Sequence, residues 1–113
     1  MKTKFYSSIK ENKSFRKAYS RGRYFVSPVL VTYVLRNRTG LLRVGITTSK
    51  KTGNAVRRSR SRRIIREAFR PLSEHTARGW DLVFVARGRT PFVKSWEIRR
   101  TMEKQLRTAG VLK

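Results

Sequence analysis

The residues with the clearest chemical meaning lie in one stretch, Lys50 to Arg70, whose charged side chains are almost all cationic. Glu67 is its single acid. The cations of the stretch are Lys50, Lys51, Arg57, Arg58, Arg60, Arg62, Arg63, Arg66 and Arg70. Like charges at this spacing repel one another, and a polyanion outside the fold would offset that repulsion.

Most of this stretch forms an amphipathic helix when it is laid out at about 100° per residue. The apolar side carries Ile64, Ile65, Ala68, Phe69 and Leu72. The opposite side carries Ser59, Arg60, Arg62, Arg63, Arg66 and Arg70. Arginines four residues apart destabilise a helix by about a few tenths of a kcal/mol per pair, and the helix dipole disfavours Arg57 and Arg58 near its N-terminus. An ordinary solvated face is the alternative, but such faces usually mix both signs of charge.

The residues just before this helix suit the same anionic partner. Thr47 to Asn54 is predicted to be a loop in which Lys50, Lys51 and Gly53 let the backbone come close to an anion. Asn54 is the predicted N-cap of the helix. The predicted anion-binding set is therefore Lys50, Lys51, Asn54, Ser59 and the seven arginines from Arg57 to Arg70.

Aromatic residues offer a second surface. Phe15 and Tyr19 lie one helical turn apart, a spacing equally consistent with core packing and with a groove where unpaired bases stack, at about 1–3 kcal/mol per base. Arg43 and Gly45 share one face of a predicted strand. That face suits either close approach by a phosphate chain or ordinary exposure to solvent.

Composition limits the classes of function. The 113 residues suffice for one domain, residues 1–113. Lys and Arg total 29 against 6 Asp and Glu, and the formal charge of +23 points to nucleic acid or another anionic surface. A membrane is not the expected partner, because no apolar run approaches the roughly 20 residues of a spanning helix. Without cysteine or a signal-like N-terminal segment, a cytoplasmic location is expected.

No enzymatic centre is predicted on this chain. With no cysteine, one histidine (His75, given no role) and six scattered acids, a zinc site, a Cys–His nucleophile and a carboxylate cluster for a metal are not expected. The sequence has no P-loop or dinucleotide-binding fingerprint. Any catalytic groups are expected to belong to the partner.

Hydrophobic periods and turn residues predict the elements that position these side chains. Residues 1–11 are predicted to be an irregular arm, and a helix runs from a cap at Asn12 or Ser14 to about Ser20, with Gly22 ending it. The central helix is expected to run from Asn54 to about Arg70, because Pro71 does not favour its continuation. The predicted last helix has a cap at Ser95, runs to about Ala109 and stops at Gly110.

Three strands are predicted between these helices. The first is Tyr24–Leu35, with an edge or irregular beginning at Pro28. The second is Leu41–Thr48, after a turn at residues 37–40. The third is Asp81–Arg87, expected in the centre of the sheet because it is nearly continuous in apolar character. The order predicts an α+β two-layer sandwich with helices packed on a small mixed β-sheet.

Short motifs around the cationic stretch form a specific series. Val44-Gly45 is followed by Ser49-Lys50-Lys51, then Gly53-Asn54-Ala55-Val56 and an Arg58-Ser59-Arg60 core. Arg62-Arg63 and Arg66-Glu67 come next, and the likeness extends outward to Phe15, Tyr19, Tyr33 and residues 81–87. Over nearly the whole chain the sequence resembles the protein subunit of bacterial ribonuclease P. Ser59 stands where that family usually has Asn, and serine keeps a donor and an acceptor but lacks the reach of the amide.

The resemblance implies a subunit of a ribonucleoprotein that removes the 5′ leader of precursor tRNA by metal-dependent hydrolysis, with the RNA as catalyst. It implies a ribosomal protein S5 domain 2-like fold with a left-handed βαβ crossover, against the usual right-handed rule. It places Mg²⁺ in the holoenzyme and no metal site on the protein. The residues implied to face the catalytic RNA are Arg58, Arg60, Arg62, Arg63 and Arg66. Those implied to line a groove for the leader are Phe15, Tyr19, Tyr33 and Arg43.

Two other functions use the same charge. A structural RNA-binding protein, such as a ribosomal protein, is the main alternative. A DNA-binding module is the weaker one, because the basic helix lacks the Asn or Gln beside Arg that commonly reads bases. The expected partners are therefore the catalytic RNA of ribonuclease P and precursor tRNA, with no DNA.

Overall fold

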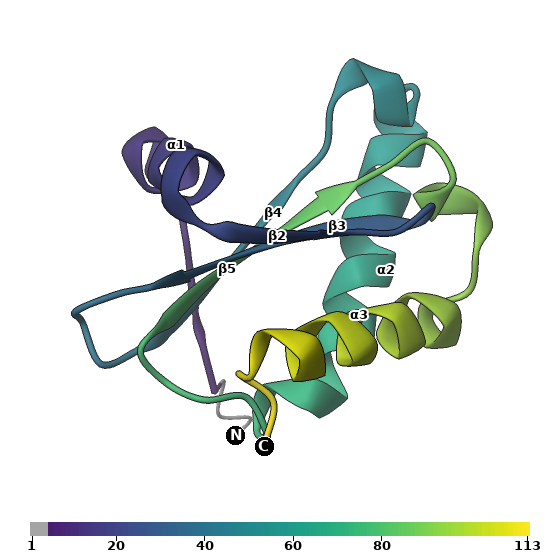
Figure 1. Cartoon of the computed structure of the whole chain (residues 1–113). Helices are drawn as coiled ribbons and strands as arrows, with labels where there is room; N and C mark the ends of the chain where they lie inside the picture. Colours follow the sequence, from purple (N-terminus) through teal and green to yellow (C-terminus); the bar gives the residue numbers. More distant parts are fainter. Residues whose placement is uncertain (1–4) are drawn as a thin grey trace, which may run out of the picture.

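The computed structural model describes residues 5–113, which fold around one five-stranded mixed sheet (Figure 1). The strands are β1 (Ser7–Ser8), β2 (Arg23–Val26), β3 (Leu30–Arg36), β4 (Leu42–Thr47) and β5 (Trp80–Ala86). Their order across the sheet is β1-β4-β5-β3-β2. β5 is parallel to β4 and antiparallel to β3, so the predicted central position of this apolar strand is confirmed.

Helices cover both faces of the sheet. α1 (Asn12–Arg21) lies on one face, and α2 (Ala55–Ser73) and α3 (Ser95–Ala109) lie on the other, as Figure 1 shows. The 3-10 helices η1 (Lys50–Thr52) and η2 (Thr90–Phe92) precede α2 and α3. The predicted α+β class with a mixed sheet is confirmed, and the crossover unit is β4–α2–β5. The sheet is a middle layer, where the sequence predicts two layers, because its central strands are apolar on both faces. Within residues 5–113, no helix is long and apolar enough to span a bilayer.

The main core lies between the sheet and the layer of α2 and α3. The predicted apolar side of α2 is confirmed, because each of its residues from Ile64 to Leu72 named above is at most 8% exposed. Leu42 and Val44 of β4 face the same core. The buried stripe of α3 is Ile98, Met102, Leu106 and Ala109. Burying a large apolar side chain contributes about 1.5–3 kcal/mol, which holds α2 in place despite its charges.

A smaller cluster holds α1 on the opposite face. Ala18 packs there with Ile9 and Val83, and all three side chains are buried. Gly45 lies directly beneath the ring of Phe15, since an added Cβ would lie 2.5 Å from the Cε1 atom of Phe15. Both predictions for Gly45, contact with a phosphate chain and exposure to solvent, are therefore wrong, because α1 covers this part of the sheet.

Two predictions about the strands are wrong. The single strand predicted at 24–35 is the hairpin of β2 and β3. The Oγ atom of Ser27 accepts hydrogen bonds from the amides of Val29 at 3.2 Å and Leu30 at 3.0 Å, which stabilises the reversal around Pro28. The arm predicted to be irregular contains β1, which pairs in parallel with β4. Residues 1–4 of that arm lie outside the described residues.

The observed ends of α1 and α3 agree only in part with the ends predicted from the sequence. Gly22 directly follows α1, and Gly110 ends α3 in the left-handed conformation with φ of 80°. Both predicted N-caps are wrong, because Glu11 precedes α1 and Lys94 precedes α3 without a capping side-chain hydrogen bond.

α2 continues past Pro71 to Ser73, whereas the sequence predicts an end near Arg70. Proline removes one backbone donor, but here the loss falls in the last turn. Leu72 is buried in the main core, and the Oγ atom of Ser73 donates to the carbonyl oxygen of Arg70 at 2.7 Å. These contacts outweigh the local preference of proline.

Gly45→Ala tests the contact between α1 and the sheet. Because the new methyl group would lie 2.5 Å from the Phe15 ring, we expect the free energy of unfolding in urea to fall by about 1–3 kcal/mol. Adding Phe15→Leu should recover part of that loss, since leucine leaves room for the methyl group. A double variant whose loss is at least the sum of the single losses would contradict this packing.

Candidate nucleic-acid interface

The exposed side of α2 carries four arginines, Arg60, Arg63, Arg66 and Arg70, which we call the cationic face. Opposite them, the apolar residues of the helix are buried, so the helix cannot turn its charges inward without exposing its core side. Arg57 is also exposed, in the first turn of the helix. The structure therefore brings these predicted residues together on one surface.

No acid of the described chain neutralises the cationic face. The ion pairs among residues 5–113 are Lys13–Glu11, Arg43–Asp81, His75–Glu74 and Arg107–Glu103, and none of them involves α2. Glu67 is exposed, and none of these ion pairs among residues 5–113 involves it. The guanidinium groups of this face are thus available to anions from outside.

Two arginines of α2 make hydrogen bonds within the fold. The Nη1 atom of Arg62 donates to Thr48 Oγ1 at 2.8 Å, and its Nη2 atom donates to Ser59 Oγ at 3.3 Å. Arg58 donates to the carbonyl oxygen of Gly53 at 3.1 Å. Both side chains are half-buried. Arg62 therefore lies at the edge of the cationic side, where only part of its side chain is exposed, whereas the helical period predicts that it lies fully on that side.

The segment before α2 is more ordered than the predicted loop. Lys50 and Lys51 are exposed on η1, whose capping Ser49 accepts a hydrogen bond from the amide of Lys51 at 3.3 Å. The predicted N-cap is confirmed, because Asn54 Oδ1 accepts a hydrogen bond from the amide of Arg57 at 3.0 Å. The Asn54 side chain is therefore engaged in ordering the first turn, and the two lysines extend the cationic surface.

A groove of about 510 Å³ lies between α1 and the end of β4. Its lining residues are Asn12, Phe15, Arg16, Tyr19, Ile46, Thr47, Thr48 and Arg62. Phe15 is half-buried, with its ring packed against Gly45 of β4. Tyr19 is 40% exposed, and its hydroxyl donates a hydrogen bond to Thr47 Oγ1 at 3.2 Å. Both residues therefore line the groove and Phe15 also packs on the sheet, whereas stacking of bases there stays a prediction. Arg62 belongs to the groove and to α2, so it joins the two surfaces.

The aromatic surface continues from the groove across the sheet. The Tyr33 ring lies 5.0 Å from the Tyr19 ring and 5.9 Å from the Tyr24 ring, measured between centroids. Tyr24 is 65% exposed. The sequence pattern does not indicate Tyr24, because it predicts Tyr24 and Tyr33 in one strand, whereas they are cross-strand neighbours in the β2–β3 hairpin. The turn signal at Pro28 was the feature that could have identified this pairing.

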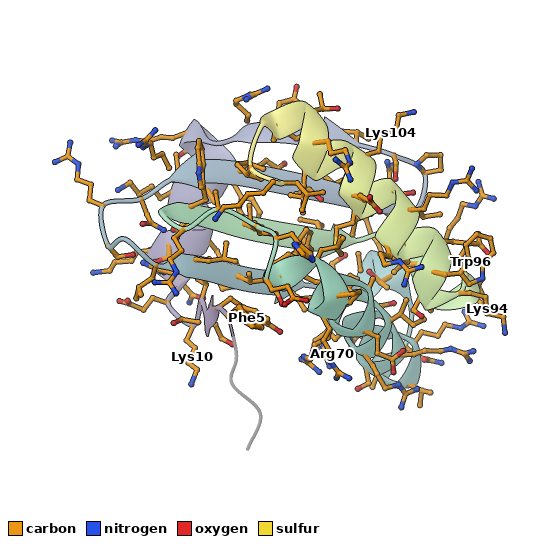
Figure 2. All side chains as sticks on the ribbon, turned by 90° about the horizontal axis from the view of Figure 1, so that it is seen from below. Phe5, Lys10, Arg70, Lys94, Trp96 and Lys104 are labelled. Carbon is orange, nitrogen blue, oxygen red and sulfur yellow. The ribbon has the colours of Figure 1, made fainter. Side chains whose placement is uncertain are left out.

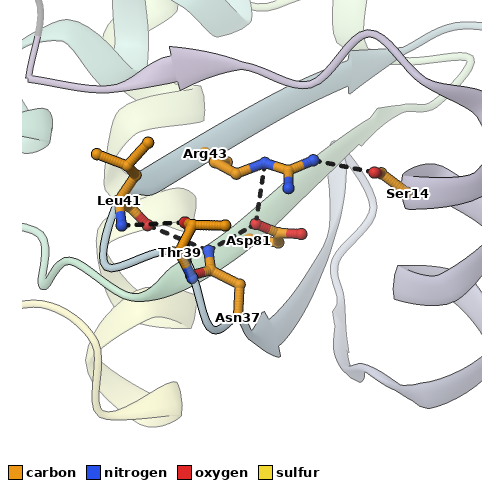
Figure 3. Close-up of polar contacts among 6 residues, drawn as sticks. All are labelled: Ser14, Asn37, Thr39, Leu41, Arg43 and Asp81. Atoms are coloured by element: carbon orange, nitrogen blue, oxygen red, sulfur yellow. Dashed lines mark hydrogen bonds and ion pairs between the residues drawn. The ribbon is translucent and has the colours of Figure 1, made fainter.

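Arg43 does not join the aromatic residues with which the sequence groups it. It lines a separate hollow of about 680 Å³ on another side of α1, together with Lys17, Arg21 and Asp81. Figure 3 shows its guanidinium group between Asp81, 3.5 Å away, and Ser14, which accepts its hydrogen bond at 2.9 Å. The buried Asp81 carboxylate also accepts a hydrogen bond from Asn37 at 2.7 Å. These contacts fix Arg43 against the sheet.

Metal binding has no visible basis in the part of the chain that the structure describes. Residues 5–113 contain no group of three or more His, Cys, Asp or Glu side chains that could hold an ion.

Comparisons with known sequences found one family model and a set of relatives that span nearly the whole chain. Residues 4–110 match the family model described as Ribonuclease P. A ribonuclease P protein component of Clostridium kluyveri is 39% identical over 107 residues, covering 93% of this chain and 96% of the relative. One from Clostridium botulinum (strain Langeland) is 37% identical over 106 residues, with the same coverage of both proteins.

Solved structures show the same fold. The RNase P protein of Staphylococcus aureus is 31% identical, with a TM-score of 0.79 over 94% of this chain and 97% of that one. The RNase P protein of Thermotoga maritima is 24% identical, with a TM-score of 0.77 over 88% of this chain and 94% of that one, and its likeness concerns the fold alone.

Proposed function

The chain belongs to the ribonuclease P protein family, and we propose that within this RNA-processing enzyme it binds the catalytic RNA and the 5′ leader of precursor tRNA. The RNA subunit would carry out the metal-dependent hydrolysis that releases the leader. This chain would assist by holding both RNAs. The observation that supports the proposal most is the cationic face of α2, which has no acid partner within residues 5–113.

The cationic face is proposed to bind the catalytic RNA. Each guanidinium group can form two parallel hydrogen bonds with phosphate oxygens, and a folded RNA presents many phosphates at close spacing. Lys50 and Lys51 would continue this contact beyond the helix. Binding would also remove the like-charge repulsion along α2, because phosphates would neutralise neighbouring arginines.

The groove beside α1 is proposed to bind the leader. A leader is single-stranded, so its unpaired bases can stack on the exposed tyrosines Tyr19 and Tyr24 while its backbone follows nearby cations. Arg16 and Arg62 line the same groove and supply that charge. Because Arg62 also belongs to α2, a leader in the groove would pass next to the catalytic RNA.

Magnesium enters this proposal only through the RNA. The described residues offer no ligand cluster, so the ions that assist hydrolysis would be held by RNA phosphates. The cationic side chains would lower the repulsion between the catalytic RNA and its substrate. The protein would thereby reduce the concentration of magnesium that productive binding requires.

Reconstitution at low magnesium tests the function directly. We expect this protein to accelerate cleavage of precursor tRNA by the catalytic RNA, because it supplies cations that free magnesium would otherwise provide. The measurement is the single-turnover cleavage rate with and without protein at several magnesium concentrations. A protein that binds the catalytic RNA without changing the rate would instead fit a structural RNA-binding protein.

Salt dependence tests the cationic face. Arg63→Ala and Arg66→Ala should each flatten the slope of log affinity against log salt by about one unit, since each removes one phosphate contact. Arg107→Ala is the matched control, because Arg107 is exposed on α3 and already paired with Glu103 at 2.9 Å. Equal slopes for all three variants would count against the face as the RNA contact.

The leader groove is tested with Tyr19→Ala. The variant should bind precursor tRNA with a leader about 5- to 100-fold more weakly and bind mature tRNA unchanged, because only the leader offers unpaired bases to this ring. Tyr19→Phe keeps the ring and loses only the hydrogen bond to Thr47, so its affinity should stay near that of the unchanged protein. Equal loss for both tRNAs would refute the leader assignment.

A further inference from the structure

A second group of exposed apolar side chains lies away from the groove. Tyr19 and Tyr24 belong to the groove surface, but Val56, Phe92 and Trp96 lie at the beginnings of α2 and α3, with 76%, 67% and 52% of their surface exposed. Exposed aromatic rings lose the free energy that burial would provide, so a cluster of them commonly marks a binding surface.

The geometry ties this group to the cationic helix. Phe92 closes η2, which packs against α2, and the guanidinium carbon of Arg57 lies 5.0 Å from the centre of its ring. Trp96 stands in the first turn of α3, four residues later. Figure 2 shows Trp96 and Lys94 at the outer end of α3, at the margin of the molecule. Arg57 covers part of one ring, and most of both aromatic side chains still faces solvent.

The charges around the two rings are nearly all positive. The exposed cations from residue 87 to residue 100 are Arg87, Arg89, Lys94, Arg99 and Arg100, and Arg57 adds another from α2. Glu97, which is half-exposed, is the one acid from residue 87 to residue 100. Flat apolar rings beside cations match a nucleotide, because the base can stack on a ring while its phosphate pairs with a guanidinium or ammonium group. A second copy of this chain fits poorly, because its net charge of +23 would repel the same cations.

We propose that Phe92 and Trp96 form a stacking platform for unpaired nucleotides of the catalytic RNA. The platform rests on the proposed function, since it takes the RNA on the cationic face to be the partner. It is distinct from the leader groove, because α1 and α3 lie on opposite faces of the sheet (Figure 1) and no residue that lines the groove belongs to η2 or α3. The catalytic RNA would thus be held by phosphate contacts along α2 and by base contacts at its N-terminal end.

Tryptophan fluorescence and salt titration test the platform. The chain has two tryptophans, so Trp80→Phe leaves Trp96 as the only one, and its emission should be quenched when the catalytic RNA binds without any substrate.

Phe92→Ala and Trp96→Ala should each weaken binding of the catalytic RNA about tenfold, with an unchanged salt slope, because stacking neutralises no phosphate. Trp96→Phe should lose less. Leu41→Ala, which removes another exposed apolar side chain (49% exposed), should change nothing.

Each outcome separates the platform from the proposed function. Normal affinity of Phe92→Ala and Trp96→Ala, or unquenched Trp96 emission in the Trp80→Phe protein, would overturn the platform and leave the function intact. If the unchanged protein fails to bind the catalytic RNA, the proposed function fails. The platform is then tested with single-stranded oligoadenylate, and it is overturned if this RNA does not quench the Trp96 emission of the Trp80→Phe protein. A change in sedimentation of the protein alone on Trp96→Ala would instead identify a contact between copies and would also overturn it.

Discussion

Repulsion among the arginines of α2 is the constraint that this fold has to satisfy. Arginines four residues apart destabilise a helix, and no acid within residues 5–113 pairs with them. The opposing contribution comes from the other side of the helix, where Ile65 and Phe69 are 0% and 1% exposed. Asn54 adds a capped first turn. Because core packing and the N-cap hold the helix, the guanidinium groups of the cationic face remain free for a partner, and both proposed RNA contacts on this side follow from that.

Local patterns in the sequence predicted the parts of the structure that depend on one element at a time. The 3.6-residue period located the buried side of α2, and the apolar run of β5 indicated its central place in the sheet. Arg62 shows where this approach ends. The helical period places it on the polar side, but Thr48 from a neighbouring segment accepts its hydrogen bond and draws it partly inward. A helical projection contains no information about that neighbour.

The groove could not be predicted in detail, because it depends on contacts between distant segments. Tyr24 and Tyr33 meet only since the chain reverses around Pro28 and the two strands pair. Arg43 and Asp81 are 38 positions apart in the chain, yet they meet because β4 and β5 are parallel neighbours. The spacing of residues predicted the presence of aromatic and cationic groups on the first helix and strand. Pairing of the strands decided which of these groups share a surface.

The place of β5 in the sheet has a consequence for how the chain assembles during synthesis. β5 is the last strand to leave the ribosome, yet it separates β4 from β3 and forms hydrogen bonds with both. The β2–β3 hairpin can close early because its two strands are adjacent in sequence. The pair of β1 and β4 forms no hydrogen bonds with that hairpin until β5, which ends at residue 86, has emerged and lies between them. A nascent chain interrupted before β5 therefore holds two unconnected pieces of sheet, each with an unpaired edge open to aggregation.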